Sequence, residues 1–286
     1  MRRLTRAQIS NFKNHLFEEE KSKATLDKYI RDIEAFYAWS SNKKLDKGCI
    51  LSYKAFLSES YATASVNSMI SSLNCFFTYL EWFELRVKTI KVQKQIFTSN
   101  ERELTKSEYE RLLSAAQASG NRRLYLLMQA ICSTGIRVSE LQFITVRAIN
   151  SGKAEIDCKG KQRFAFLPTE LCKILKEYVR EQKIKSGPVF ITKGGKPLDR
   201  SNIWSDMKKL YKMAGVSGKK IFPHNLRHLF ARTYYTSQKD IVRLADILGH
   251  TSVNTTRIYT METGEIHRKQ IGRLGLVKIL EQESGV

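Results

Sequence analysis

Apolar residues recur at helical spacing in the first third of the chain. In residues 25–40 they follow one another at i, i+3, i+4 and i+7, which places them along one face of an α-helix. The members of this stripe are Leu26, Tyr29, Ile30, Ile33, Phe36 and Tyr37. A second stripe of the same kind consists of Val66, Met69, Ile70, Leu73, Phe76, Phe77 and Leu80. With shorter apolar faces near Ile9 and Leu51, residues 1–88 are predicted to form a bundle of four or five helices.

The side of the second helix opposite its apolar stripe carries short polar residues in place of the usual mixture of Glu and Lys. They are Ser65, Asn67, Ser68, Ser71 and Asn74. Such a surface could approach DNA closely and bond to phosphates or base edges, although a merely hydrophilic helix surface has the same composition. The start of the first helix offers further candidates for phosphate contact, since basic side chains and a helix N-terminus both favour an anion. These are Lys21, Lys23, Thr25, Lys28 and Arg31.

A change of pattern separates this bundle from the rest of the chain. Residues 87–102 lack apolar periodicity and carry Lys88, Lys91 and Lys94 among polar groups, so we interpret residues 89–102 as a linker that crosses a polyanion. A second domain, residues 103–286, begins at Thr105-Lys-Ser-Glu108, which is a capping box ahead of a helix.

The second domain is predicted to be rich in α-helix with one small β-sheet. An apolar run over residues 124–132 is typical of a core helix, and its end delivers Arg137 and Glu140 to the start of the next helix. Alternating residues over 153–167 predict a β-hairpin with a basic tip at Lys159-Gly-Lys-Gln162. Helices over 169–182 and 199–214 follow, then several short ones, and a last apolar helix is expected within 265–281.

The charge of the chain narrows the class of partner. Lys and Arg number 49 against 28 Asp and Glu, a formal net charge of +21, so a polyanion is the natural partner. Because the basic residues are spread along the chain, nucleic acid is favoured over an anionic lipid surface or a basic protein with solvated lysines. No segment reaches the roughly 18 apolar residues of a membrane span, and no signal peptide is recognisable, so we expect a cytoplasmic protein. Five cysteines without a Cys-x-x-Cys pair indicate free thiols, with neither a disulfide frame nor a zinc site.

The last third of the chain concentrates residues suited to attack on a phosphodiester. His224 and Arg227 are three apart and would share one face of a helix, so both could reach one phosphate. Arginine suits the non-bridging oxygens because its planar fork binds two of them and stays protonated. Lysine or histidine suits proton transfer to the leaving oxygen. A His-x-x-Arg pair by itself is also common on protein surfaces, so the longer strings around it decide the interpretation.

These strings resemble the boxes that characterise the tyrosine recombinase family. Phe222-Pro-His-Asn-Leu-Arg-His-Leu-Phe-Ala231 resembles its His-x-Leu-Arg-His box. Leu244-Ala-Asp-Ile-Leu-Gly-His250, followed by a segment ending at Tyr259, is similar to its Leu-Gly-His segment and nucleophile-bearing helix. Thr134-Gly-Ile-Arg-Val-Ser-Glu-Leu141 is similar to its first arginine box. The likeness covers residues 133–260 and, more weakly, 5–88, and the size is closest to compact Xer-type recombinases.

The resemblance implies a nucleophile and two phosphate clamps. Tyr259 would attack phosphorus, with Tyr234 and Tyr235 as the nearest alternatives in the sequence. Arg137 and Arg227 would bind the non-bridging oxygens of the phosphate.

It also implies the groups that move protons. Lys159 would protonate the leaving oxygen, although Lys161 remains a local alternative. His224 would assist proton transfer and His250 would donate a hydrogen bond to a phosphate oxygen, while Glu140 would fix neighbouring groups without touching the phosphate. Further contacts with DNA are expected from Lys161, Arg163 and Arg200.

Taken together, the resemblance implies a SAM-like helical core-binding bundle joined to an α-rich catalytic domain. The function implied is site-specific DNA recombination through a covalent 3′-phosphotyrosyl intermediate, with no metal or other cofactor. The expected partners are double-stranded DNA with an inverted-repeat site and further protomers, as a tetramer on two sites, or a related recombinase. The last helix would dock on a neighbouring protomer or pack on its own domain. The alternatives are a DNA-binding regulator or architectural protein that retains the fold, and a type IB topoisomerase-like relaxing enzyme.

Overall fold

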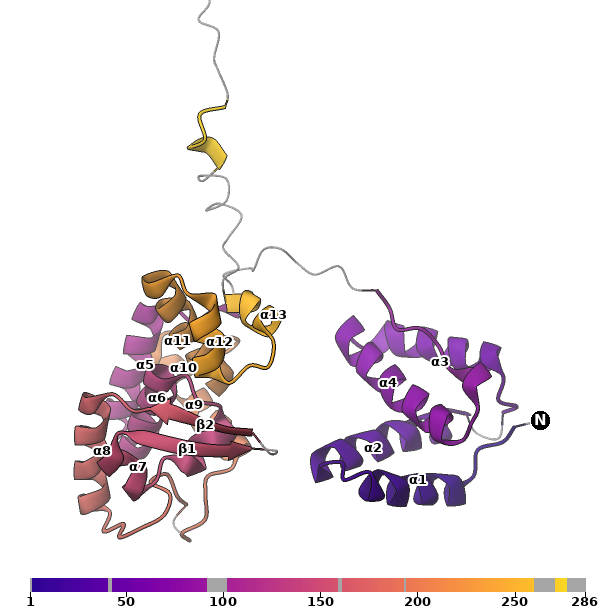
Figure 1. The fold of residues 1–286 in the computed structure, drawn as a ribbon, viewed down its shortest axis with the longest axis horizontal. Helices are drawn as coiled ribbons and strands as arrows, with labels where there is room; N and C mark the ends of the chain where they lie inside the picture. The colour runs from indigo at the N-terminus through magenta and orange to yellow at the C-terminus, as the bar shows by residue number, and fades with distance from the viewer. Residues whose placement is uncertain are drawn as a thin grey trace, which may run out of the picture. The chain divides into compact units, whose positions relative to one another are not determined.

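The computed structural model describes residues 2–40, 43–91, 102–158, 161–192, 194–259 and 271–276. The chain forms two compact units, Met1–Lys94 and Gln95–Val286, and each has its own apolar core. Both are mainly helical, and within the described ranges the sheet is a two-stranded antiparallel hairpin in the second unit (Figure 1). The predicted fold class, mainly α with a small β-sheet, is confirmed.

The first unit is a helical bundle around aromatic side chains. Its helices are α1 (Arg6–Glu18), α2 (Lys23–Ser40), α3 (Lys47–Ser60) and α4 (Thr63–Tyr79), followed by the 3₁₀ turn η1 (Phe83–Leu85). α2 packs against both α1 and α4 (Figure 1). The predicted apolar stripes meet in the interior, where the rings of Phe12 and Phe76 lie edge to face with centroids 5.0 Å apart. Burial of these stripes explains why helical spacing recurs along this part of the sequence.

Two asparagines of α4 bind the segment that follows the bundle. The side-chain amide of Asn67 donates to the carbonyl of Ile90 at 2.9 Å and accepts from the amide nitrogen of Ile90 at 2.7 Å. Asn74 makes the same pair of bonds with Val87, at 2.8 and 3.0 Å. A primary amide has one donor side and one acceptor side, so it can substitute for a backbone partner. The amide of Asn67 thus holds the protein's own backbone, and its contact with DNA stays a prediction.

Lys28 also makes contacts inside the bundle. Its ammonium group lies 2.8 Å from a carboxylate oxygen of Asp32 and donates to the carbonyl of Ser68 and the hydroxyl of Ser72, both at 2.7 Å. Asp32 is 5% exposed, and its charge needs this partner. These contacts use all three donors of the lysine inside the bundle. Contact of Lys28 with a phosphate stays a prediction.

The other residues predicted to bind DNA in this unit are accessible or half-buried. The Thr25 hydroxyl lies 2.8 Å from that of Ser22 at the start of α2. The exposed members of the predicted set are Lys21, Lys23, Arg31, Ser65, Ser68 and Ser71. Contact of these side chains with DNA stays a prediction.

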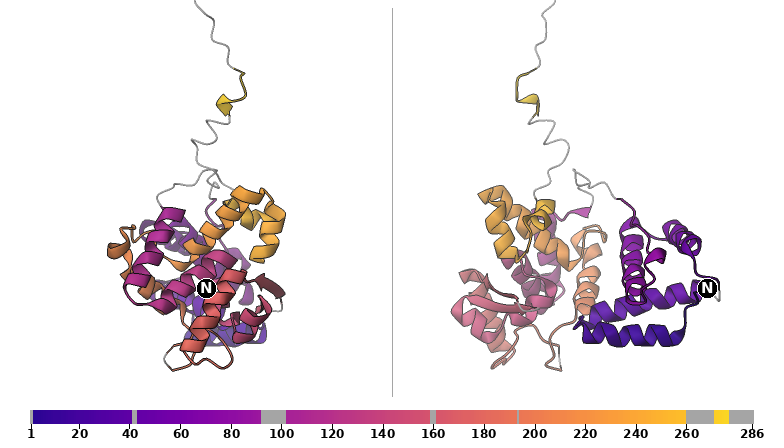
Figure 2. Two further views of the ribbon diagram at one scale, coloured as in Figure 1. Left: turned by 90° about the vertical axis from the view of Figure 1, so that its left-hand side faces the viewer. Right: turned by 45° about the vertical axis from the view of Figure 1, so that its right-hand side comes forward.

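The second unit consists of helices and one hairpin around its own apolar core. Its helices are α5 (Lys106–Ala118), α6 (Arg122–Thr134), α7 (Val146–Ser151), α8 (Thr169–Glu181), α9 (Arg200–Lys209), α10 (Tyr211–Ala214), α11 (Pro223–Gln238), α12 (Ile241–Leu248) and α13 (Val253–Thr256). Two 3₁₀ helices, η3 (Val138–Phe143) and η4 (Arg257–Tyr259), accompany them. α6 packs along α11, and α11, α12 and α13 gather at one end of the unit (Figure 2). No described helix is both long and apolar enough to span a membrane.

The hairpin consists of β1 (Lys153–Cys158) and β2 (Lys161–Phe166), paired from Lys153 with Phe166 to Cys158 with Lys161. The hairpin tip at Lys159 and most of the predicted linker lie outside the described residues, as does the expected last helix except for residues 271–276.

The helix predicted after Arg137 is the short 3₁₀ helix η3, and at its start the Glu140 carboxylate accepts from the backbone N–H of Arg137 at 2.7 Å. One local prediction needs correction. The helix predicted over 199–214 is divided into α9 and α10 at Leu210, whose backbone N–H bonds to the carbonyl of Met207, three residues back.

Replacement of Asn74 by alanine should destabilise the first unit. The change leaves the N–H and C=O of Val87 without their partner on α4, and lost hydrogen bonds at partly buried sites cost about 1–3 kcal/mol. Chemical denaturation followed by circular dichroism would measure this loss. Ser71→Ala on the same helix is the matched control, because among the described residues Ser71 bonds to the carbonyl of Asn67 in its own helix and to nothing outside it. Equal stability of the two variants would contradict the assignment.

Candidate active site

Arg227 is buried between the C-terminal ends of two helices. It lies on α11, is 1% exposed, and donates to the carbonyls of Gly135 at 2.5 Å and Leu248 at 2.7 Å. α6 ends just before Gly135 and α12 ends at Leu248, so both carbonyls belong to helix ends that lack intrahelical partners. The negative ends of the two helix dipoles also favour a cation here. The burial of this guanidinium is therefore compensated by backbone oxygens.

Glycine is required at both of these helix ends. Gly135 has φ +66° and Gly249 has φ +63°, in the left-handed region that ends a helix. A Cβ at position 135 would lie 2.4 Å from the ring of Phe230, and one at position 249 would lie 2.4 Å from Cδ of Arg163. The close approach and the backbone conformation together exclude a side chain.

The end of α12 receives three arginines. Arg163 donates to the carbonyl of Ile247 at 2.8 Å, Arg227 donates to that of Leu248, and Arg137 donates to that of Gly249 at 3.3 Å. These arginines come from β2, α11 and the start of η3, so the helix end gathers segments distant in sequence. The terminal carbonyls of α12 thereby order three cations.

Glu140 joins two of these arginines. One carboxylate oxygen accepts from Nη1 of Arg137 at 2.8 Å, and the other accepts from Nη2 of Arg163 at 2.6 Å. Glu140 is 2% exposed, whereas the Arg137 side chain is 41% exposed. The carboxylate thus fixes Arg137 from behind while part of its guanidinium stays accessible. Arg163 was included among the predicted DNA contacts; in the structure its guanidinium bonds to Glu140 and to the carbonyl of Ile247.

His250 is held in one tautomer by its neighbours. Its Nε2 lies 3.0 Å from Nη2 of Arg227, and its Nδ1 lies 2.9 Å from the hydroxyl of Thr256. Arginine can only donate, so Nε2 accepts and the proton resides on Nδ1. Burial and the nearby charge of Arg227 lower the pKa of His250 to about 4, in agreement with a neutral ring. Donation from Nε2 to a phosphate, as the resemblance implies, requires a new proton or the other tautomer.

Tyr259 lies beside two histidines. It ends η4, is 3% exposed, and its ring centroid lies 4.7 Å from that of His228 and 6.0 Å from that of His250. The Tyr259 side chain is also close enough to Arg227 that a negative charge on its oxygen would raise the pKa of that arginine. Tyr234 is half-buried on α11 and packs against the small apolar cluster that contains Tyr259.

His228 and Thr256 take part in this arrangement, although the sequence did not single them out for a role. The His228 ring lies between those of His224 and Tyr259, with its centroid 4.6 Å from that of His224. Burial, followed by the charges of His224 and Arg232, lowers the pKa of His228 to about 4. The only sequence signal for these two residues is their place within the quoted strings.

Several of the predicted catalytic side chains line one cleft. It has a volume of about 200 Å³, and its walls are formed by Ile136, Arg137, Val138, Ser139, Arg200, Pro223, His224 and Arg227. Burial and the charge of Arg137 lower the pKa of Arg227 to about 10, and burial together with the charge of Arg227 lowers the pKa of His224. Cations that repel one another around a small cleft form a site suited to an anion. Lys159 and the side chain of Lys161 lie outside the described residues.

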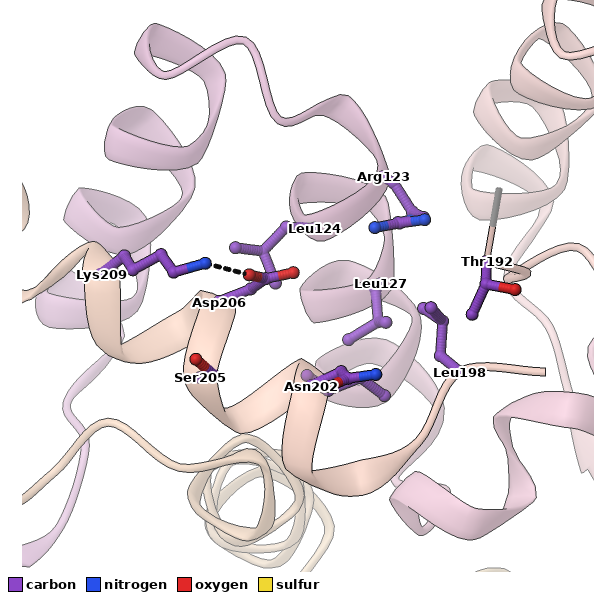
Figure 3. A pocket seen from close by; sticks show the side chains of 10 residues that line it. Arg123, Leu124, Leu127, Thr192, Leu198, Asn202, Ser205, Asp206 and Lys209 are labelled. Atoms are coloured by element: carbon purple, nitrogen blue, oxygen red, sulfur yellow. Dashed lines mark hydrogen bonds and ion pairs between the residues drawn. The ribbon is translucent and has the colours of Figure 1, made fainter. Parts of the chain in front are cut away.

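A larger cavity lies elsewhere in the same unit. It has a volume of about 330 Å³ and is bordered by Arg123, Thr192, Asn202, Asp206 and Lys209, together with apolar side chains (Figure 3). Lys209 pairs with Asp206 at 2.8 Å, and Arg123 donates to the carbonyl of Ile191. Its lining contains no histidine, cysteine or tyrosine. We therefore assign the chemistry to the cleft at Arg137 and Arg227.

The cleft and the two units define a class of protein. Residues 102–265 match the model of the phage integrase family, and residues 9–84 match the N-terminal SAM-like domain of phage integrases. The chain therefore belongs to the phage integrase family, and the resemblance inferred from the boxes is confirmed.

Individual relatives are similar over nearly the whole chain. Tyrosine recombinase XerA of Pyrococcus furiosus is 27% identical over 282 residues, which are 95% of this chain and 95% of the relative. Tyrosine recombinase XerD of Xanthomonas campestris is 28% identical over 280 residues, covering 88% of this chain and 87% of the relative.

Solved structures show the same fold. A crystal structure of XerA recombinase covers 96% of this chain and 100% of that chain, with 26% identity and a TM-score of 0.52. A λ integrase dimer bound to a core site covers 89% of this chain and 94% of that chain, with 18% identity and a TM-score of 0.73.

The second unit should lose stability in mild acid. The pKa values of His228 and His250 are about 4 in the folded chain against an ordinary 6.5, so the unfolded chain binds more protons between these values. The free energy of unfolding should be at its full value above pH 6.5 and should fall as the pH drops toward about 4. Denaturant titrations between about pH 7 and pH 5 would measure the slope. His228→Asn removes one of the two groups and should flatten it, and an unchanged slope would contradict this explanation.

Proposed function

We propose that this protein is a site-specific DNA recombinase that breaks and rejoins strands through Tyr259. The observation that carries the proposal is the cleft at which Arg137, Arg227 and His224 meet, with Tyr259 packed beside the Arg227–His250 pair. A phosphodiester has two non-bridging oxygens, and two fixed guanidiniums match them. The match to the phage integrase family over residues 102–265 supports the same reaction class.

The reaction balances without loss of a high-energy bond. The Tyr259 oxygen attacks phosphorus, the bond from phosphorus to the 5′ oxygen breaks, and the strand end becomes a 3′-phosphotyrosyl ester. Attack by the 5′ hydroxyl of another strand reverses these steps and frees the tyrosine. Arg137 and Arg227 would stabilise the charge on the non-bridging oxygens in the transition state, which is typically the largest single contribution to such catalysis. Because Arg137 and Arg227 are held by Glu140 and by helix-end carbonyls, little reorganisation is needed when the phosphate arrives.

The proton steps are assigned to the remaining residues. We assign protonation of the leaving 5′ oxygen to a lysine of the hairpin tip, Lys159 or Lys161. His224 borders the cleft and would assist proton transfer around tyrosine and phosphate. His250 would donate to the phosphate from Nε2 in its other neutral tautomer, after turning away from Arg227.

The proposed partners are DNA and further protomers. Solved structures with this fold include XerH bound to its difH substrate and a λ integrase tetramer bound to a Holliday junction. We propose the same kind of substrate here, a duplex with an inverted-repeat site bound by both units, with four protomers joined on two sites. Arg200 lies on the wall of the cleft and is exposed, so it is placed to meet the phosphate backbone. Since its substrate is DNA, we propose that the protein acts in the cytoplasm.

Two other functions are less well supported. A regulator that only binds DNA would have no need of the ordered arginines and histidines beside Tyr259. A type IB topoisomerase-like enzyme shares the chemistry but would relax DNA without dependence on a site. The Xer-type relatives, alike over almost their whole length, favour recombination.

Tyr259→Phe should abolish covalent capture of DNA. A duplex site selected from randomised DNA, nicked near the cleavage position, traps the phosphotyrosyl intermediate because the cut fragment diffuses away. Removal of the hydroxyl removes the nucleophile but keeps the buried ring, so binding should be retained. Denaturing electrophoresis measures the adduct and a gel shift measures binding. Tyr234→Phe is the matched control and should retain capture. An adduct that persists in Tyr259→Phe would overturn the assignment.

The identity of the general acid can be tested with a 5′-bridging phosphorothiolate. In this substrate sulfur replaces the leaving oxygen. The pKa of a thiol is far lower than that of an alcohol, so the thiolate leaves without help from an acid. Lys159→Ala should lose the cleavage of ordinary DNA, by about 10²- to 10⁴-fold, and should recover with the sulfur substrate. Lys161→Ala should cleave ordinary DNA normally and should gain nothing from the sulfur substrate. Recovery in Lys161→Ala instead would assign the acid to that residue, and recovery in neither variant would contradict a lysine acid.

A further inference from the structure

Arg163 occupies an unusual position on the hairpin. On β2 the side chains of Phe164 and Phe166 point to solvent and are 51% and 73% exposed, while the Arg163 side chain is 15% exposed on the opposite face with Ala165. This reverses the usual polarity of a half-buried strand, in which apolar residues face the core. An arginine on the inner face, with phenylalanines outside, indicates that its polar contacts determine its place.

The contacts of Arg163 join three elements. One nitrogen donates to Glu140 on η3 at 2.6 Å, and the other donates to the carbonyl of Ile247 on α12 at 2.8 Å. Gly249, which follows α12, leaves the space that the aliphatic part of Arg163 occupies. Arg163 therefore connects the hairpin, two positions after Lys161, to the elements that hold Arg137 and Arg227.

The net charge of the cluster formed by Glu140, Arg137 and Arg163 depends on Arg163. Glu140 is buried and binds two guanidiniums, so one negative charge is set against two positive charges. The less exposed cation, Arg163, compensates the buried carboxylate. Arg137 can then be oriented by Glu140 without having its own positive charge cancelled. Without Arg163 the carboxylate would be paired with Arg137 alone, and the pair would carry no net charge toward the phosphate.

We propose that Arg163 is a positioning residue for strand cleavage: it holds Glu140 and the end of α12, and through them Arg137, and it does not contact DNA. The proposal rests on the proposed function, because it names how one residue supports that reaction. It predicts a defect in the chemical step and not in DNA binding.

The test compares Arg163→Met and Arg163→Lys with Arg147→Met in the full-length protein. Arg147 is an exposed residue of α7 whose side chain makes no hydrogen bond or ion pair with the described residues, so its loss removes the same charge. The probe is the selected duplex site, nicked to trap the adduct. Binding is measured at several salt concentrations, and the cleavage rate is measured at saturating protein. Thermal unfolding shows whether each variant is folded.

Arg163→Met should bind with the same salt dependence as Arg147→Met, since loss of a phosphate contact would lower the slope by about 0.9. Its cleavage rate at saturation should fall about 10- to 100-fold, as for other residues that orient a reacting group. Arg163→Lys keeps the charge but cannot bond to Glu140 and Ile247 with a planar fork, so it should recover part of the rate. Weaker binding and a smaller slope with an unchanged saturated rate would overturn the proposal.

A double variant separates positioning from a general loss of structure. If Arg163 acts through Glu140, adding Glu140→Gln to Arg163→Met should slow cleavage by much less than the product of the two single effects. Independent losses that multiply would mean that Arg163 does not act through Glu140, which would also overturn the proposal. If the unsubstituted protein forms no Tyr259 adduct, the proposed function fails. If it forms the adduct and Arg163→Met does so at the same rate, only the role of Arg163 fails.

Discussion

The second unit depends on the burial of one guanidinium between two helix ends. A buried arginine costs several kcal/mol unless it is compensated, and Arg227 donates from Nη1 and Nη2 to the carbonyls that α6 and α12 leave unpaired, while its Nε has no partner among the described residues. The same bonds fix how these helices meet α11, since α11 carries Arg227 into the space between them. The need to bury a cation and the need to terminate two helices are met by one set of hydrogen bonds. This is why the left-handed glycines 135 and 249 stand at those ends.

The charge around Arg227 exceeds what the protein itself neutralises. Arg137, Arg163 and Arg227 converge on the end of α12, while Glu140 is the carboxylate that binds Arg137 and Arg163. Burial, followed by repulsion from Arg137, lowers the pKa of Arg227, and burial with the charges of Arg227, Arg137 and Arg163 lowers the pKa of His250 to about 4. A phosphate bound here, as proposed above, would relieve this repulsion.

In the first unit polar side chains organise the fold more than expected. Asn67 and Asn74 bind the backbone that leaves the bundle, and Lys28 compensates the buried Asp32. These bonds fix the direction of the chain at the point where it leaves the bundle. A polar helix face can therefore have a structural purpose even when its composition suits DNA.

The sequence by itself determined the helical bundle and the hairpin, and the motifs around Tyr259, Arg137 and Arg227 indicated the family. Periodicity and motif spacing are local properties of the chain, so they can be read without the fold. It could not assign partners to Lys28, Asn67 or Arg163, nor find the tautomer of His250 or the place of His228. Each of those depends on which backbone oxygens the ends of helices leave unpaired and on which segment folds against them. Arg163 and Gly249 are 86 positions apart in the chain, and only tertiary packing brings them into contact. Local pattern thus predicts which residue types face inward or outward, whereas the choice of hydrogen-bond partner among buried groups is made by the folded structure.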